Sequence, residues 1–202
     1  MKNFKKELPP FYGEVLHIGA NDRKLVLLLC FVGIPLALGT VFLAYLPFWG
    51  ENFMDLVYGE DSASTLFLFL GLGIYSLLHE VAHGLGYKLM TGEKISLRYG
   101  KGGVYCGVPD LYTSRKAALT ATLTPFVVFT VLFGVALILL FGLSPQFYML
   151  TSMVVGVHLC TCTKDLYVAR ILLTHRGKDE LLVREVETDL YFYLPKEENR
   201  RV

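Results

Sequence analysis

Residues 76–84 read S-L-L-H-E-V-A-H-G and lie inside an apolar run from Thr65 to Met90. They contain the pattern H-E-x-x-H. In an α-helix, residues i and i+4 share one face, so His79 and His83 can present two imidazole nitrogens to one zinc ion. Glu80 lies about 100° further round the helix, where it can take a proton from a water on that zinc. The stretch therefore predicts a metal-binding helix with Glu80 as its catalytic group.

A buried His-Glu-His cluster can also be a hydrogen-bonded structural patch, or a site that has lost its metal. Two histidines and a glutamate are costly inside a membrane, however, and ionisable groups at that depth usually serve a function. The apolar surroundings of the motif therefore favour a functional metal site over a structural cluster.

The composition indicates a membrane protein. The chain has 202 residues, of which 53% are hydrophobic and 18% are charged, and the charges are gathered into blocks. Four runs reach the length of about 20 residues that a membrane-crossing helix needs: Leu25–Trp49, Thr65–Met90, Ala117–Leu143 and Phe147–Leu173. We therefore expect an all-α polytopic membrane protein with four transmembrane helices, a short cytoplasmic β-hairpin and a C-terminal strand. Pro35 and Pro125 predict kinks or local breaks in two of these helices.

Charge and cysteine content exclude several other classes of protein. The net charge of +1 gives no basic field of the kind that a nucleic-acid-binding protein needs. The four cysteines form no C-x-x-C pair, so we expect reduced thiols rather than a disulfide framework or a cysteine zinc site. The polar segment 1–24 lacks the apolar core and cleavage site of a signal peptide, so the first span is expected to stay as an anchor.

The lysines and arginines predict the orientation in the membrane. They precede the first span, lie between the second and third, and continue from Lys164 onward, whereas Gly50–Ser64 and Ser144–Gln146 contain none. The positive-inside rule then places the N-terminal segment 1–24, the loop 91–114 and the tail 176–202 on the cytoplasmic side of the cell membrane, around a membrane domain at 25–175.

The loop 91–114 has the pattern of a β-hairpin. Apolar and polar residues alternate up to Tyr99, Gly100–Gly103 reads as a turn, and Val104–Val108 reads as a second strand. The hairpin is either an ordinary surface connector or an edge that clamps an extended substrate by main-chain hydrogen bonds. In the second case the candidate substrate contacts are Ile95, Leu97, Tyr99 and Tyr105. Residues Leu182–Leu194 partly alternate and predict one more strand.

Catalytic zinc usually takes three protein ligands and keeps one position open. The last apolar run offers His158 and Asp165, which are seven residues apart and share a helix face. The expected depth in the membrane favours Asp165 as the third ligand. It lies five residues before Arg170, as His83 lies five residues before Lys88, so both are about 7.5 Å from a basic flank. His158 would lie about 10 Å deeper, and it stays open as an alternative ligand, a substrate-facing residue or a buried core histidine.

An H-E-V-A-H motif in a membrane helix, followed by a basic strand-forming segment and two further spans, resembles the intramembrane zinc metalloproteases of the site-2 protease type. The closer likeness is to a group of small four-span zincin peptidases, and it covers most of the chain. The resemblance implies zinc held by the two motif histidines and Asp165. In site-2 proteases this aspartate stands in an L-D-G context after Asn-Pro, whereas residues 162–166 read C-T-K-D-L. His158 therefore remains an alternative third ligand.

These observations lead to the hypothesis of a membrane zinc metallopeptidase with Glu80 as general base and then general acid. Its substrate would be a membrane protein or peptide segment that enters the site in extended form, because an exposed carbonyl is needed. Candidate donors to the developing oxyanion are Tyr99, Tyr105 and His158. Two other hypotheses stay open: a non-catalytic membrane scaffold that keeps a zincin-like site, and a metal-dependent hydrolase of a small amphiphile.

Overall fold

The computed structural model describes residues 3–19, 22–58, 63–100, 103–108, 110–175 and 180–196. The chain forms two compact units. Unit 1 contains Met1–Leu25, Glu80–Pro125 and Asp165–Val202, and unit 2 contains Val26–His79 and Phe126–Lys164. Three of the boundaries fall inside long helices, so each of these helices contributes residues to both units.

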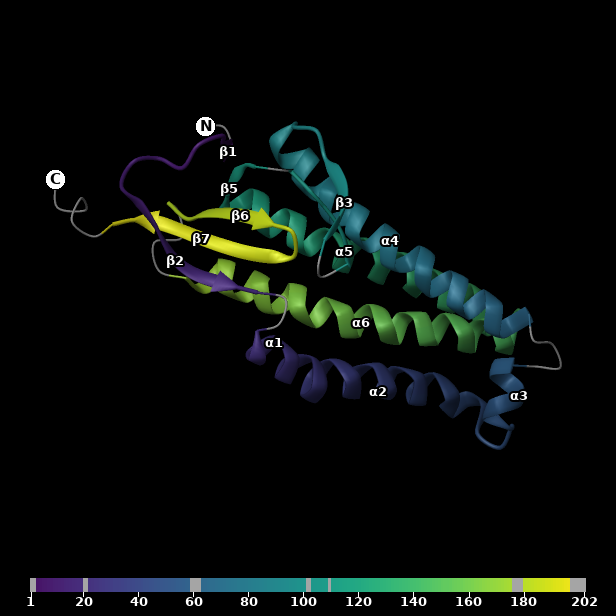
Figure 1. Cartoon of the computed structure of the whole chain (residues 1–202). Coiled ribbons are helices and arrows are strands. Elements are labelled where there is room, and N and C mark those ends of the chain that lie inside the picture. Colours follow the sequence, from purple (N-terminus) through teal and green to yellow (C-terminus); the bar gives the residue numbers. More distant parts are fainter. Residues whose placement is uncertain are drawn as a thin grey trace. The chain divides into compact units, whose positions relative to one another are not determined.

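The first predicted span is one helical run with a local irregularity. It consists of α1 (Arg23–Leu28), a π-helical turn η1 (Leu29–Gly33), α2 (Ile34–Tyr45) and a 3₁₀ turn η2 (Leu46–Phe48) (Figure 1). The π-helical turn ends two residues before Pro35, which removes one i→i−4 hydrogen bond and so disturbs the regular ladder. The short helix α3 (Phe53–Tyr58) follows.

Three long helices complete the helical part: α4 (Ala63–Thr91), α5 (Arg115–Phe141) and α6 (Pro145–Thr174). Among the described residues, three helical runs are long and apolar enough to cross a membrane: Arg23–Phe48, Ala63–Thr91 and Arg115–Phe141. The expectation of four transmembrane helices is therefore wrong. The run expected at Phe147–Leu173 does form a helix, α6, but polar residues from His158 to Asp165 interrupt its apolar character.

The expectation of an all-α fold is also wrong, because unit 1 contains a five-stranded antiparallel sheet. Its order is β1 (Phe4–Lys5), β5 (Tyr112–Ser114), β6 (Leu182–Val186), β7 (Asp189–Pro195) and β2 (Tyr12–Ile18). The purple strand β2 lies beside the yellow strand β7 in Figure 1, so the two ends of the chain meet in one sheet. Tyr12 pairs with Pro195 and Ile18 with Leu190.

The tail forms two strands where one was expected. β6 and β7 make a hairpin whose turn includes Glu187 at φ 56°, a left-handed conformation that tight turns require. The hairpin expected in the loop 91–114 is confirmed as β3 (Ser96–Gly100) paired with β4 (Gly103–Gly107). The middle of its predicted turn, residues 101 and 102, lies outside the described residues.

Each unit has its own apolar core. In unit 1 the sheet packs on the final turns of α6, where Leu172 and Phe192 are fully buried beside Val168. Because Val168 lies three residues after Asp165, this core fixes the segment of α6 that carries the aspartate. In unit 2, Val57 and Met149 form the centre of a second cluster.

Candidate metal centre

His83 and Asp165 approach each other within unit 1. The His83 Nε2 atom lies 3.6 Å from Asp165 Oδ1, and Asp165 is buried. This separation is longer than the usual N–H···O hydrogen bond. Two ligands of a tetrahedral zinc ion, each about 2.0–2.1 Å from the metal, lie about 3.3 Å apart. The pair therefore has nearly the spacing of two adjacent zinc ligands.

The other ring nitrogen of His83 determines which atom faces the aspartate. His83 Nδ1 lies 2.9 Å from the main-chain carbonyl oxygen of Ala121 on α5. A carbonyl oxygen can only accept, so Nδ1 carries the hydrogen and the lone pair of a neutral ring is on Nε2. Zinc-binding histidines commonly have this arrangement, in which the second ring nitrogen donates to a carbonyl. His83 is thus held in the tautomer that a metal ligand needs.

Glu80 and the β3–β4 hairpin lie close together in unit 1. A Cβ atom on Gly84 would overlap the sulfur of Cys106, so this glycine allows β4 to pack directly on α4. Burial raises the pKa of the Cys106 thiol, and the Glu185 and Glu80 carboxylates raise it further. Cys106 therefore stays a neutral thiol, while Gly84 brings the hairpin to α4 one turn after Glu80.

His79 belongs to a buried polar network in unit 2. Its Nδ1 atom lies 2.9 Å from the hydroxyl of Tyr75, one turn earlier on α4. The same hydroxyl lies 2.9 Å from His158 Nδ1 and 3.0 Å from Thr161 Oγ1. Tyr75, His79 and His158 are all nearly inaccessible to solvent. When Nδ1 of His79 donates to Tyr75, the lone pair of His79 is on Nε2, as in His83.

His158, the alternative third ligand, has hydroxyl partners at both ring nitrogens. Its Nε2 atom lies 3.1 Å from Thr130 Oγ1, and its Nδ1 atom faces Tyr75. Cys162 Sγ lies 3.5 Å from His158 Nδ1. His79, His158 and Cys162 form a group that could hold a metal ion, with ligand atoms within 4.8 Å of one another. The structure thus brings His158 to a thiol and a phenol, and brings Asp165 to His83.

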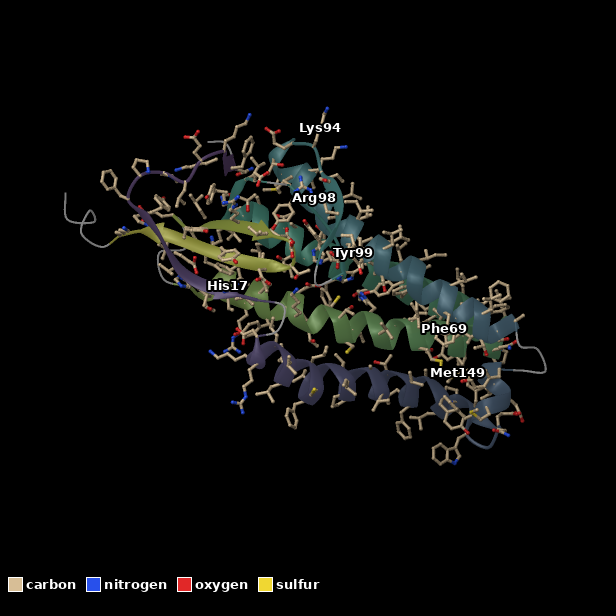
Figure 2. All side chains as sticks on the ribbon, in the orientation of Figure 1. His17, Phe69, Lys94, Arg98, Tyr99 and Met149 are labelled. Atoms are coloured by element: carbon tan, nitrogen blue, oxygen red, sulfur yellow. The ribbon has the colours of Figure 1, made fainter. Side chains whose placement is uncertain are left out.

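The four predicted substrate contacts do not form one surface. Ile95 packs on the buried cluster of Tyr87 and Val108. Leu97 and Tyr99 are exposed, with 51% and 85% of their surface accessible, and Figure 2 labels Tyr99 on the hairpin. Tyr105 is on the opposite hairpin face, where it lines a cavity of about 220 Å³ with Ser96, Arg98, Gly107, Val108, Asp110, Glu185, Val186 and Glu187.

Sequence reasoning missed Tyr75 and the Ala121 carbonyl. Tyr75 stands four residues before His79, so helical spacing could have identified it as a partner on the same face. The contact of Ala121 with His83 joins two helices through a main-chain atom, which side-chain patterns do not reveal.

Comparison with known proteins gives one match. A family model described as "Putative zincin peptidase" matches residues 72–178, which is more than half of the 202-residue chain. This region begins shortly before the H-E-x-x-H motif and includes Asp165. A search of curated proteins and a search of solved structures returned no match.

Proposed function

Because the chain belongs to the zincin peptidase family, we propose that it is an integral membrane zinc metallopeptidase that hydrolyses peptide bonds in or near the bilayer. The approach of His83 to Asp165 carries this proposal. It supplies an imidazole on α4, the helix that bears the H-E-x-x-H glutamate, and a carboxylate on α6, at nearly the spacing of two zinc ligands.

We expect His79, His83 and Asp165 to hold the zinc ion. Two imidazoles and one carboxylate suit zinc and leave a fourth position open, as catalytic sites require. Zinc in this site supplies Lewis-acid chemistry and lowers the pKa of a water molecule to near neutrality. Because α4 is one continuous helix, His79 and His83 share a face one turn apart. The Nδ1 partners of both rings support ligation through Nε2.

Glu80 is the proposed acid–base group. It would accept a proton from the attacking water and then donate a proton to the leaving amine. Its position next to the first motif histidine matches this role, and its carboxylate lies near enough to Cys106 to raise the pKa of that thiol. General acid–base catalysis of this kind contributes about 10²–10⁴-fold to a rate.

The substrate is proposed to be an extended peptide segment of a membrane protein. The β3–β4 hairpin is a two-stranded sheet among the described residues, and it packs on α4 at Gly84. An extended peptide could add to its edge by main-chain hydrogen bonds, with the exposed Leu97 and Tyr99 side chains beside it.

The proposed location is the cell membrane, with the five-stranded sheet on the cytoplasmic side. The three apolar helical runs support membrane insertion. Sheet edges and loops exposed to lipid are not tolerated in hydrocarbon, so one sheet belongs on one side of a bilayer. The lysines and arginines near these strands favour the cytoplasmic side.

The proposal is tested by replacing Glu80 with Gln in the full-length protein reconstituted in vesicles. Cleavage of a panel of single-span peptides should fall by at least about 10²-fold while zinc stays bound. Glu51→Gln, at an exposed position before α3, is the matched control and should cleave normally. An active E80Q variant would overturn the mechanism. Cleavage of ester amphiphiles but of no peptide would support a hydrolase of small amphiphiles instead of a peptidase. Zinc binding without turnover of either substrate would support a non-catalytic scaffold.

A further inference from the structure

Helix α5 has a proline in its interior. A proline has no N–H group, so Pro125 cannot donate to the carbonyl four residues earlier, which belongs to Ala121. The proline ring also crowds the carbonyl at this position and disturbs its alignment with the helix axis. In α5, Ala121 is thus the one residue whose main-chain oxygen lacks its regular donor because of Pro125.

The Ala121 carbonyl is also the acceptor for His83 Nδ1, at 2.9 Å. The helices are in close contact here, because a Cβ atom on Gly86 would overlap the Cα atom of Ala121. Gly86 lies three residues after His83 and therefore on the same face of α4. The imidazole can reach the main chain of α5 because the two helices approach this closely.

We propose that Pro125 is a positioning residue for the metal centre: it frees the Ala121 carbonyl to accept the Nδ1 hydrogen of His83. This inference rests on the proposed function. Membrane helices tolerate proline where neighbouring groups satisfy the freed main-chain atoms, and here the neighbouring group is the imidazole of a proposed ligand. The hydrogen bond orients the ring and keeps the lone pair of Nε2 towards Asp165.

Replacement of Pro125 distinguishes a positioning role from a structural one, because it should weaken zinc binding without destabilising the metal-free helix. Pro125→Ala restores an N–H that competes with His83 for the Ala121 carbonyl. The helix of the metal-free protein should become more regular and at least as stable, since proline is the least favourable residue in a helix interior. Zinc binding should become weaker at the same time, because His83 loses part of its orienting hydrogen bond.

The experiment measures zinc affinity by competition with a fluorescent chelator, and the thermal midpoint of the metal-free protein, on the full chain in detergent. Loss of an outer hydrogen bond to a zinc ligand typically costs 10–100-fold in affinity. A carbonyl can accept two hydrogen bonds, so we expect the lower end, about 10-fold, for Pro125→Ala and for Pro125→Val. Pro35→Ala is the matched control, because it restores an N–H in α2, and it should leave zinc affinity unchanged.

Wild-type zinc affinity in both Pro125 variants would overturn the inference and leave the proposed function standing. An equal loss of zinc affinity in Pro35→Ala would also overturn the inference, because removal of any helix proline would then have the same effect. Failure of the wild-type protein to bind zinc would instead overturn the proposed function, and this inference with it.

Discussion

Tyr75 has one hydroxyl proton and three neighbours that can accept it. They are His79 Nδ1, His158 Nδ1 and Thr161 Oγ1, all within 3.0 Å. If the proton goes to His79, the hydrogen of this neutral ring is on Nε2, and Nε2 cannot then bind a metal. If His158 or Thr161 takes the proton, the Tyr75 oxygen can accept the Nδ1 hydrogen of His79. The competing acceptors thus favour the tautomer that zinc binding needs.

Replacement of Tyr75 by Phe should weaken zinc binding by about 10–100-fold, because it removes the hydroxyl that orients His79. The ring itself is retained, so its contacts with Phe129 and Phe133 persist and the fold should be kept. Chelator competition on the purified protein measures the effect. Tyr148→Phe removes a hydroxyl elsewhere in unit 2 and should bind zinc normally. Equal affinity in the Tyr75 and Tyr148 variants would show that the network does not tune the metal.

The residues of the proposed centre could be nominated from the sequence alone. The H-E-x-x-H spacing selects His79 and His83 as a pair on one helix face, and equal distances from basic flanks select Asp165 as a partner for His83. The structure places that pair 3.6 Å apart. Sequence could not identify the Ala121 carbonyl, since main-chain acceptors carry no side-chain pattern.

At the level of elements, the five-stranded sheet restricts the arrangement in a membrane. β2 comes from the N-terminal segment, β5 follows the β3–β4 hairpin, and β6 and β7 come from the tail. The five strands form one hydrogen-bonded sheet, so in the proposed membrane arrangement we expect these three polar segments on the same side of the bilayer. The segment that joins α2 to α4 contains no lysine or arginine, so in the proposed arrangement we expect it on the opposite side.

This arrangement predicts the behaviour of reporter fusions in cells. A fluorescent protein that matures only in the cytoplasm should be bright when it is attached to either end of the chain. Alkaline phosphatase, which is active only outside the cytoplasm, should be active when it is inserted after Gly50. Active phosphatase at one end of the chain and a bright fluorescent protein at the other would contradict a single sheet on one side.

The strands differ in how far sequence could predict them. The β3–β4 hairpin has alternating side chains on both sides of a glycine-rich turn, so local pattern was sufficient. β2 and β7 pair across almost the whole chain, with Tyr12 opposite Pro195, and no local pattern reveals such a partner. Residues 182–194 had been predicted as a single C-terminal strand, whereas β2 had been read as part of a polar terminal segment, so the five-stranded sheet was not expected.

At the scale of the whole molecule, α6 carries both the apolar core of unit 1 and polar groups for the proposed site. His158, Lys164 and Asp165 interrupt its apolar sequence, and α6 is not among the three candidate spans of the described residues. The prediction of a fourth span was wrong because it relied on the length of the apolar run, although His158 and Asp165 had been identified inside it. Of these residues, Asp165 is the one that the proposed metal centre uses.

The zinc content of the purified full-length protein tests the central claim most directly. We expect stoichiometric zinc in the wild-type protein and in His17→Ala, since His17 on β2 pairs with Asp189 in the sheet, outside the proposed centre (Figure 2). His83→Ala and Asp165→Ala should lose the metal, with affinity reduced by more than the 10–100-fold typical of an outer hydrogen bond, while His158→Ala should retain it. Zinc retained in Asp165→Ala and lost in His158→Ala, with a zinc–sulfur distance of about 2.3 Å in the X-ray absorption spectrum, would contradict the account and assign the ion to His158 and Cys162.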